Sequence, residues 1–537
     1  MRRRHLFLVL GFALTALLGY WIADSAAPRQ AARVQAIPTE PKRLVVDENE
    51  ALPKFRRGDR ITTYRHDDEA TANGALAGQR NVVFKDRAAL EDFLKRAGEH
   101  VRVMGRLDAL NALRVAFLDY DDLASLLDDS QKESLVFPVD VPTAGQGTTQ
   151  PGAVGLGAGL LDWLGITVDN SAWGAGVRIA ILDTGVTSSR AFSSSISAIN
   201  MVDLPYDLAA QNGHGTAVAS MIIGQSSLTP GVAPGSNILS IRIANDFGQS
   251  DSFLLAQGIV AAVDGGAQLI NISMGSFGDS GLVRDAIEYA RAAGALIIAA
   301  AGNNGTDQVT YPAANSGVIA VGAVDALGNH LDFSNTGSQI SLSAPGFEVN
   351  AAWIADQAAK VSGTSFSSPI VTGTIAALMS QPGSAKLTAR QAVDLLYSYL
   401  NDSGAAGTDT AVGAGMPDIG RVLNGKTPSI YDAAVASQRV IPPSAGNPNG
   451  QIEVLVQNRG TETLVNTNVQ ISTPGGVVNT NITTLPANGV QTIRIPINGV
   501  PTTDLRFGSS VSITGGHRDV KPSNDSRVET YVPPVSK

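Results

Sequence analysis

The stretch Gly363-Thr364-Ser365-Phe366-Ser367-Ser368-Pro369 places a serine at the start of an apolar segment that runs to about Met379. The small residues before Ser365 allow a tight turn, and the apolar run after it predicts a helix over 365–379. A serine in the first turn of a helix has an unpaired backbone N–H at the positive end of the helix dipole. This environment suits a nucleophile whose attack creates an oxyanion, although a lone serine in this position is more often a helix cap.

Buried strands and helices alternate along the chain from Val177 onward. Largely apolar runs, with Arg242 as their one charged residue, predict strands at 179–182, 238–243, 268–272, 295–300 and 318–321. Helix patterns lie between and after them, at 216–223, 252–264, 281–293, 365–379 and 388–400. Continuous apolar strands that alternate with helices are typical of a parallel sheet covered on both faces. The predicted fold class of this region is therefore α/β.

Two further residues stand where chemistry is expected in such a sheet. Asp183 follows the strand 179–182, and catalytic groups of open α/β sheets gather at the carboxyl ends of strands. His214 is the only one of the six histidines with a glycine on each side. Taken singly, each residue is more often structural. Together with Ser365 they follow the chain order Asp, His, Ser, which is one of the known orders of the Ser-His-Asp triad.

The motifs Asp183-Thr-Gly, His214-Gly-Thr and Gly363-Thr-Ser-x-x-x-Pro resemble the three signatures of the subtilisin-like serine peptidases, the subtilases, in that family's order. The resemblance covers about residues 160–425 and implies a hydrolase, a serine endopeptidase. In this family Ser365 would attack the peptide carbonyl, His214 would take its proton, and Asp183 would orient the imidazole, with no cofactor required. Two departures, Ala217 and Phe366, flank the reacting atoms rather than supply them.

The resemblance also assigns contacts to the reacting carbonyl and to the substrate. Asn303 would supply the side-chain donor of the oxyanion hole, with the Ser365 backbone N–H as the second donor. The pocket for the residue before the scissile bond would be formed by Ser273, Met274, Gly275, Ala300, Ala301 and Gly302. The substrate backbone would pair as an added strand with Gly248, Gln249 and Ser250. Because the pocket residues include no acid, we expect apolar or small substrate residues there.

Composition limits the other partners. The 537 residues are enough for several domains, and the net charge of −9 argues against nucleic acid as a partner. The absence of cysteine excludes disulfides, thiolate metal sites and cysteine catalysis. Structural calcium is common in the subtilases, but no acidic cluster has a spacing that identifies a site, so no metal ligand is predicted.

The N-terminus has the pattern of a secretory signal. Arginines at 2–4 precede the apolar run 6–22, and small residues follow it. The run is shorter than the roughly 20 residues that span a bilayer. We interpret 1–27 as a signal peptide, or alternatively as an N-terminal anchor that attaches the protein to the membrane through residues 6–22. A secreted, periplasmic or cell-surface protein is expected.

The segments around the α/β domain predict smaller units. Residues 28–79 are polar and weakly periodic and predict a low-order spacer. Residues 80–142 follow the order βαββαβ, with the last strand predicted at 135–141. This is a small α+β module, which in the subtilase resemblance is a propeptide and intramolecular inhibitor. A permanent N-terminal binding module is the alternative. The linker 143–159 is expected to contain the autocleavage site, and the catalytic domain is assigned to 160–425.

The C-terminal region differs in character. Residues 426–446 are rich in proline and glycine and predict a linker, while period-2 strands in 447–537 predict an all-β sandwich. Its strand pattern resembles bacterial adhesion-related, immunoglobulin-like domains. The main prediction for the whole chain is a self-processing peptidase that acts on proteins or peptides. Two alternatives are a catalytically silent subtilase scaffold and a surface adhesion protein that acts through the sandwich.

Overall fold

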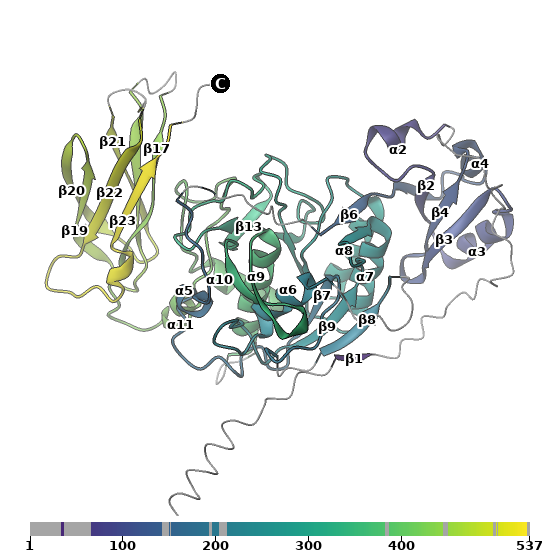
Figure 1. Ribbon diagram of the computed structural model, residues 1–537, viewed down its shortest axis with the longest axis horizontal. Helices are drawn as coiled ribbons and strands as arrows, with labels where there is room; N and C mark the ends of the chain where they lie inside the picture. Colours follow the sequence, from purple (N-terminus) through teal and green to yellow (C-terminus); the bar gives the residue numbers. More distant parts are fainter. Residues whose placement is uncertain are drawn as a thin grey trace, which may run out of the picture.

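The computed structural model describes residues 34–36, 66–141, 150, 152–192, 196–202, 212–381, 386–443, 449–497, 501 and 503–533. A central α/β domain lies between a small N-terminal module and a C-terminal β-sandwich (Figure 1). The predicted signal or anchor at 1–27 and most of the predicted spacer lie outside the described residues. Within the described ranges, no helix has the length and apolar character that a membrane crossing requires.

A parallel sheet forms the middle of the central domain. Its strand order is β1-β8-β9-β7-β11-β12-β13-β14, and every neighbouring pair is parallel. The strands are β1 (Val34–Ala36), β7 (Arg178–Asp183), β8 (Ile196–Asn200), β9 (Asn237–Arg242), β11 (Leu269–Ile272), β12 (Leu296–Ala300), β13 (Val318–Val324) and β14 (Ile340–Pro345). The sequence pattern missed β8 and β14 because both mix serine with apolar residues. It also missed the three-residue β1, which lies inside the predicted spacer 28–79 and pairs with β8.

Helices cover both faces of this sheet, which confirms the predicted fold class (Figure 1). On one face α6 (His214–Ile223) packs against α9 (Thr364–Met379), and α10 (Ala389–Tyr397) packs on α9. On the other face α7 (Ser252–Asp264) packs against α8 (Gly281–Ala292). Every residue of α6 and α9 is buried. This burial explains why neither helix contains an acidic residue, a lysine or an arginine, and why neither has a separate polar face. The domain also contains the short helices α5 (Leu160–Trp163) and α11 (Ile419–Asn424) and an antiparallel pair of strands, β15 (Val349–Ala352) and β16 (Ala358–Val361).

The N-terminal module is an antiparallel sheet of order β3-β4-β2-β5 with two helices. Its elements are β2 (Gln79–Val83), α3 (Arg87–Arg96), β3 (Val101–Leu107), β4 (Ala112–Phe117), α4 (Tyr120–Ala124) and β5 (Lys132–Leu135). The module also includes α2 (Asp68–Ala72), which falls in the predicted spacer 28–79. Asp67, at the start of α2, forms a buried ion pair of 2.5 Å with Arg80, so the end of that segment is ordered against the module.

The last strand predicted for the module, 135–141, is wrong as a single strand. The chain leaves β5 at Leu135 and forms a separate strand, β6 (Pro138–Asp140). β6 pairs antiparallel with β10 (Gln249–Asp251) of the central domain instead of with the module's own sheet. Periodicity within the segment cannot reveal this difference, because the partner strand is supplied by a distant part of the chain.

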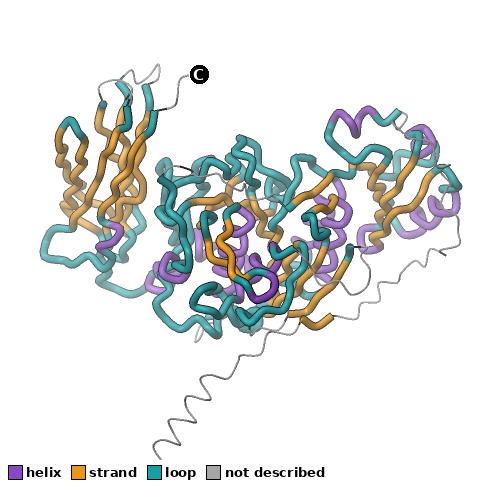
Figure 2. The backbone as a smooth tube through the Cα atoms, in the orientation of Figure 1, coloured by secondary structure: helices purple, strands orange, loops and turns teal. Residues whose placement is uncertain are grey.

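The C-terminal region contains two sheets, of order β17-β18-β21 and β20-β19-β22-β23, which fit a β-sandwich (Figure 2). The strands are β17 (Ala433–Ile441), β18 (Gln451–Asn458), β19 (Leu464–Thr473), β20 (Gly476–Leu485), β21 (Val490–Pro496), β22 (Leu505–Ser512) and β23 (Ser526–Tyr531). β17 lies inside the predicted linker 426–446, which is a correction. Three of its six buried residues are alanine and two are polar, so the strand lacks a strong apolar alternation.

Candidate active site

Asp183 and His214 are joined directly. Asp183 ends β7 and is fully buried, and its two carboxylate oxygens lie 2.9 and 3.0 Å from Nδ1 of His214. The backbone N–H and the hydroxyl of Thr184 also donate to Asp183 Oδ1, at 2.7 and 3.2 Å. A carboxylate that accepts from Nδ1–H leaves the other ring nitrogen as the proton acceptor. In the described part of the chain, the buried Nε2 of His214 has no hydrogen-bond partner.

The glycines beside His214 have a steric role. A Cβ on Gly215 would lie 2.4 Å from the carbonyl oxygen of Gly185 and 3.1 Å from the Asp183 carboxylate. A Cβ on Gly213 would lie 2.4 Å from the ring of Trp353. A larger residue at 215 would therefore push the start of α6 away from the end of β7, and a larger residue at 213 would clash with Trp353. The close packing around His214 therefore explains why a glycine stands on each side of it in the sequence.

Ser365 lies in the first turn of α9 and is 1% exposed. The preceding Gly363 has a φ of +143°, a conformation that favours glycine. The ring of Phe366 packs against the imidazole of His214 with centroids 5.2 Å apart, so the two helix starts meet at this point. In the described conformation the Ser365 hydroxyl donates to the carbonyl of Ser273 at 3.2 Å and not to His214. Catalytic hydrogen bonds are often misaligned until substrate binds.

Asn303 follows β12 and faces the same helix start. Its Oδ1 accepts two hydrogen bonds from Thr364, from the backbone N–H at 2.9 Å and from the hydroxyl at 2.8 Å. Its Nδ2 is buried and has no partner among the described residues. A Cβ on Gly363 would lie 2.9 Å from that nitrogen. The amide therefore presents an unused donor beside the turn that carries Ser365.

Residues 138–141 occupy the place predicted for a substrate. β6 pairs with β10, and the N–H of Val141 donates to the carbonyl of Gly248 at 2.8 Å. On its other side Asp140 exchanges two backbone hydrogen bonds of 3.1 Å with Gly275. The tail of the N-terminal module thus lies as an extended strand between the two predicted substrate-binding segments, and Figure 1 shows β6 entering the central domain there.

The predicted pocket residues are gathered near this strand. Met274 is fully buried and belongs to the same apolar cluster as Val139 of β6. Ala300 and Ala301 are buried, and the N–H and hydroxyl of Thr310 both donate to the carbonyl of Ala301. A Cβ on Gly275 would lie 2.5 Å from Oγ1 of Thr310, so these walls pack closely.

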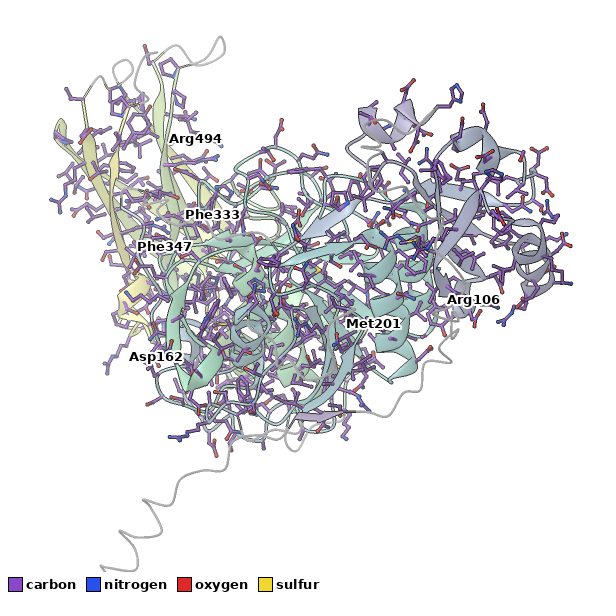
Figure 3. All side chains as sticks on the ribbon, turned by 45° about the vertical axis from the view of Figure 1, so that its right-hand side comes forward. Arg106, Asp162, Met201, Phe333, Phe347 and Arg494 are labelled. Atoms are coloured by element: carbon purple, nitrogen blue, oxygen red, sulfur yellow. The ribbon has the colours of Figure 1, made fainter. Side chains whose placement is uncertain are left out.

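Side chains around the site also join the module to the central domain. Arg114 of β4 forms an ion pair of 2.7 Å with Asp251, which caps α7. The carbonyl of Arg106, a residue labelled in Figure 3, accepts from Gln257 Nε2 at 3.1 Å. These contacts could not be predicted from the sequence, because each partner is an ordinary polar residue within its own element.

Among the described residues, one cluster combines three side chains that could bind a metal ion: His66, Asp119 and Asp121. His66 and Asp121 are exposed, and the cluster belongs to the N-terminal module rather than to the site around Ser365. Its Asp119 already caps α4 by accepting from the backbone of Asp121. Nothing in this arrangement points to a bound cation.

A model of the subtilase family matches residues 174–415. The thermostable alkaline protease of Halalkalibacterium halodurans is 35% identical over 254 residues, which cover 46% of this chain and 68% of that protein. Thermitase of Thermoactinomyces vulgaris is 34% identical over 239 residues, which cover 43% of this chain and 85% of that protein. Among solved structures, the epidermin leader peptide processing serine protease of Staphylococcus aureus has a TM-score of 0.54 at 20% identity and covers 64% of this chain and 97% of that one. At that identity the structural likeness concerns the fold alone.

Proposed function

This chain belongs to the subtilase family, and from that premise we propose that it is an exported, self-processing serine endopeptidase whose catalytic triad is Asp183, His214 and Ser365. The observation that carries the proposal is the buried Asp183–His214 pair, which leaves Nε2 of the imidazole without a partner beside the start of α9. An imidazole held in this way is a general base with its accepting nitrogen fixed in place.

In the proposed reaction, Ser365 Oγ transfers its proton to His214 Nε2 as it attacks the carbonyl carbon of the substrate. Asp183 stabilises the imidazolium that forms, and His214 then gives the proton to the leaving amine. The bond from Ser365 to the acyl group is subsequently hydrolysed by water. The tetrahedral oxyanion would accept from Nδ2 of Asn303 and from the backbone N–H of Ser365.

The N-terminal module is proposed to be the propeptide and inhibitor. This assignment is supported by the position of residues 138–141, which fill the space between the predicted substrate-binding segments with main-chain hydrogen bonds on both edges. A substrate backbone would bind as an added strand in the same way. A segment already seated there competes with every other peptide for the cleft.

We place the self-cleavage between Val141 and Gln150. On the near side, Val141 is hydrogen-bonded in the cleft. On the far side, Gln150 accepts from the N–H of Asp332 at 2.8 Å, and Leu156 donates to the carbonyl of Phe347 at 3.0 Å. Phe347 is labelled in Figure 3. Because the chain from Gln150 onward is bonded to the central domain, we expect it to remain there after the cut.

The test compares the wild-type protein with Ser365→Ala by intact mass and N-terminal sequencing. We expect the wild type to begin between residues 142 and 150, and the variant to retain the module. If both proteins retain the module and neither reacts with a fluorophosphonate probe for active serines, the chain is a silent scaffold. If both lose it equally, the cut is made by another protease. Sequencing the mature and unprocessed forms also tests whether 1–27 is removed, as expected for an exported protein.

A further inference from the structure

A fully buried asparagine lies in the middle of the central sheet, directly behind the proposed nucleophile. Asn271 is in β11, and its neighbours across the sheet are Ile181 of β7 and Ile298 of β12. An apolar side chain at position 271 could be buried between these two isoleucines without losing hydrogen bonds to water. Burying a primary amide is unfavourable unless the amide is hydrogen-bonded, so the contacts of Asn271 indicate what the residue does.

One side of the Asn271 amide reaches Ser365 through Ser273. Asn271 Nδ2 donates to the hydroxyl of Ser273 at 2.9 Å, and that hydroxyl donates to the backbone carbonyl of Ser365 at 2.8 Å. The backbone carbonyl of Ser273 accepts from the Ser365 hydroxyl at 3.2 Å. The hydroxyl and the carbonyl of Ser273 therefore both contact Ser365. Asn271 fixes the direction in which the Ser273 hydroxyl points.

The other side of the amide reaches the helix that carries Ser365. Asn271 Oδ1 accepts from the hydroxyl of Ser368 at 2.9 Å and from that of Thr372 at 3.0 Å. These two residues lie on the face of α9 that meets β11, and both are fully buried. Asn271 thus connects the second and third turns of α9 to the sheet, and all of these residues are buried.

We propose that Asn271 is a positioning residue for the nucleophile, which it places by holding the Ser273 hydroxyl and the start of α9 in one fixed arrangement. This inference rests on the proposed function of Ser365. A hydrogen-bond network in a low-dielectric interior restricts its members to one geometry when all of them are satisfied. Nucleophilic attack depends on such a geometry, and a displacement of about 1 Å can cost ~10²-fold in rate.

The test variant is Asn271→Leu, which keeps the approximate volume and removes all three hydrogen bonds. We expect kcat on a peptide amide to fall by about 10- to 100-fold, with KM within about threefold because the added-strand contacts at 248–250 and 275 are untouched. The control is Thr374→Val. Thr374 is also a buried threonine of α9, but its hydroxyl donates only to Ile370 O of its own helix, at 2.9 Å. If Asn271→Leu has the same kcat as Thr374→Val, the proposal is overturned.

A double-mutant cycle distinguishes positioning from a general loss of stability. If Asn271 acts through Ser273, adding Asn271→Leu to Ser273→Ala lowers kcat by less than it does in the wild type, because the group it orients is already gone. Full additivity in kcat would overturn the proposal. Thermal unfolding of each variant shows whether the folded fraction accounts for the rates.

Should Asn271→Leu fail to fold, the combined variant Ser368→Ala with Thr372→Val removes the helix anchor from the other side. We expect that variant to lose kcat and keep KM, and wild-type kcat would count against the proposal. The wild-type protein and Ser365→Ala are measured alongside with the fluorophosphonate probe. A wild type that does not react contradicts the proposed function itself, whereas a reactive wild type with an unaffected Asn271 variant contradicts only this inference.

Discussion

Thr364 donates two hydrogen bonds to one side-chain oxygen of Asn303, from its backbone N–H and from its hydroxyl. Because a backbone N–H can only donate, the contacted atom must be the carbonyl oxygen of the amide, and the amide nitrogen points the other way. That nitrogen is buried and, within the described ranges, unpartnered. A donor fixed before the oxyanion forms needs no reorganisation when charge develops on the substrate.

Replacing Asn303 with alanine is therefore expected to lower kcat by about 10²–10³, the loss seen when the corresponding donor is removed in a subtilisin. KM should change little, because the donor is used in the transition state and not by bound substrate. Asn304→Ala is the control, since Asn304 is the exposed neighbour of Asn303 in the same turn. Equal kcat values for the two variants would remove Asn303 from the proposed oxyanion hole.

Asp183→Asn is expected to reduce kcat by about 10⁴, the size of effect known for the same change in another Ser-His-Asp enzyme. The asparagine fills the same space, but its amide can favour the wrong imidazole tautomer and cannot stabilise the imidazolium. The measurement is steady-state kinetics on mature protein, with circular dichroism to verify the fold. A variant that retained a tenth of the wild-type rate would show that His214 is not oriented by this carboxylate.

Gly278→Ala should weaken the attachment of the N-terminal module. An added Cβ would lie 2.0 Å from the ring of Phe137, which is 5% exposed at the junction with the central domain. Overpacking of this kind costs about 1–3 kcal/mol. We expect more free module in size-exclusion chromatography after processing than in the wild type. The surface substitution Gly475→Ala, in the sandwich, should leave that fraction unchanged; equal release by both variants would contradict the contact.

Burial of Asp402 is predicted to make the protein less stable as pH rises. It is 6% exposed, and burial raises its pKa from 3.8 to about 6. Between these two values the unfolded chain loses the proton and the folded protein keeps it, so the free energy of unfolding falls as pH rises and levels off above pH 6. The difference corresponds to at most about 3 kcal/mol.

Urea unfolding of Asp402→Asn should accordingly show a weaker fall in the free energy of unfolding from pH 4 to pH 6 than the wild type, and greater stability at pH 8. Asp394→Asn, at an exposed position of α10, is the control. If the two variants follow the wild-type pH dependence equally, Asp402 is not the group that titrates.

Arg421 of α11 connects the central domain to the sandwich. Its guanidinium donates to the carbonyls of Tyr399 and Leu400 on one side, and to the carbonyl of Arg459 and the side chain of Asn488 on the other. The buried carbonyl of Leu400 would keep a second donor, Gln457 Nε2 at 3.1 Å, whereas the partly buried carbonyls of Tyr399 and Arg459 would lose the guanidinium. A buried acceptor left without a donor costs about 1–3 kcal/mol, so Arg421→Met is expected to destabilise the protein by about that amount and to speed proteolytic release of the sandwich.

The comparison for this prediction is Arg390→Met. Arg390 forms an exposed ion pair with Asp394 on α10, and such pairs contribute about 0–1 kcal/mol. Chemical unfolding and timed proteolysis of both variants provide the measurement. Equal stability and equal release would show that the sandwich is attached mainly by its covalent linker.

Much of the central fold could be predicted from sequence because its strands are continuous apolar runs and its helices fill the gaps between them. The predicted strands lie within a residue or two of those described, except at the end of β13, and helix α7 has the predicted bounds. The edge strands β1 and β14, the neighbouring β8 and the alanine-containing β17 could not be found in this way, since short or serine-containing strands have no distinctive period. The site residues remain predictions of function that the geometry supports.

The sequence by itself determined which chemical groups are present and on which local elements they stand. An aspartate at the end of a buried strand, a histidine between glycines and a serine at a helix start are local patterns, since each depends only on neighbours along the chain. The tertiary structure decided which atoms meet. The pairs Asp183–His214, Asn303–Thr364 and Asn271–Ser368, like the strand pair β6–β10, join distant segments. Such contacts depend on strand register and helix packing, which the periodicity of a single segment does not encode.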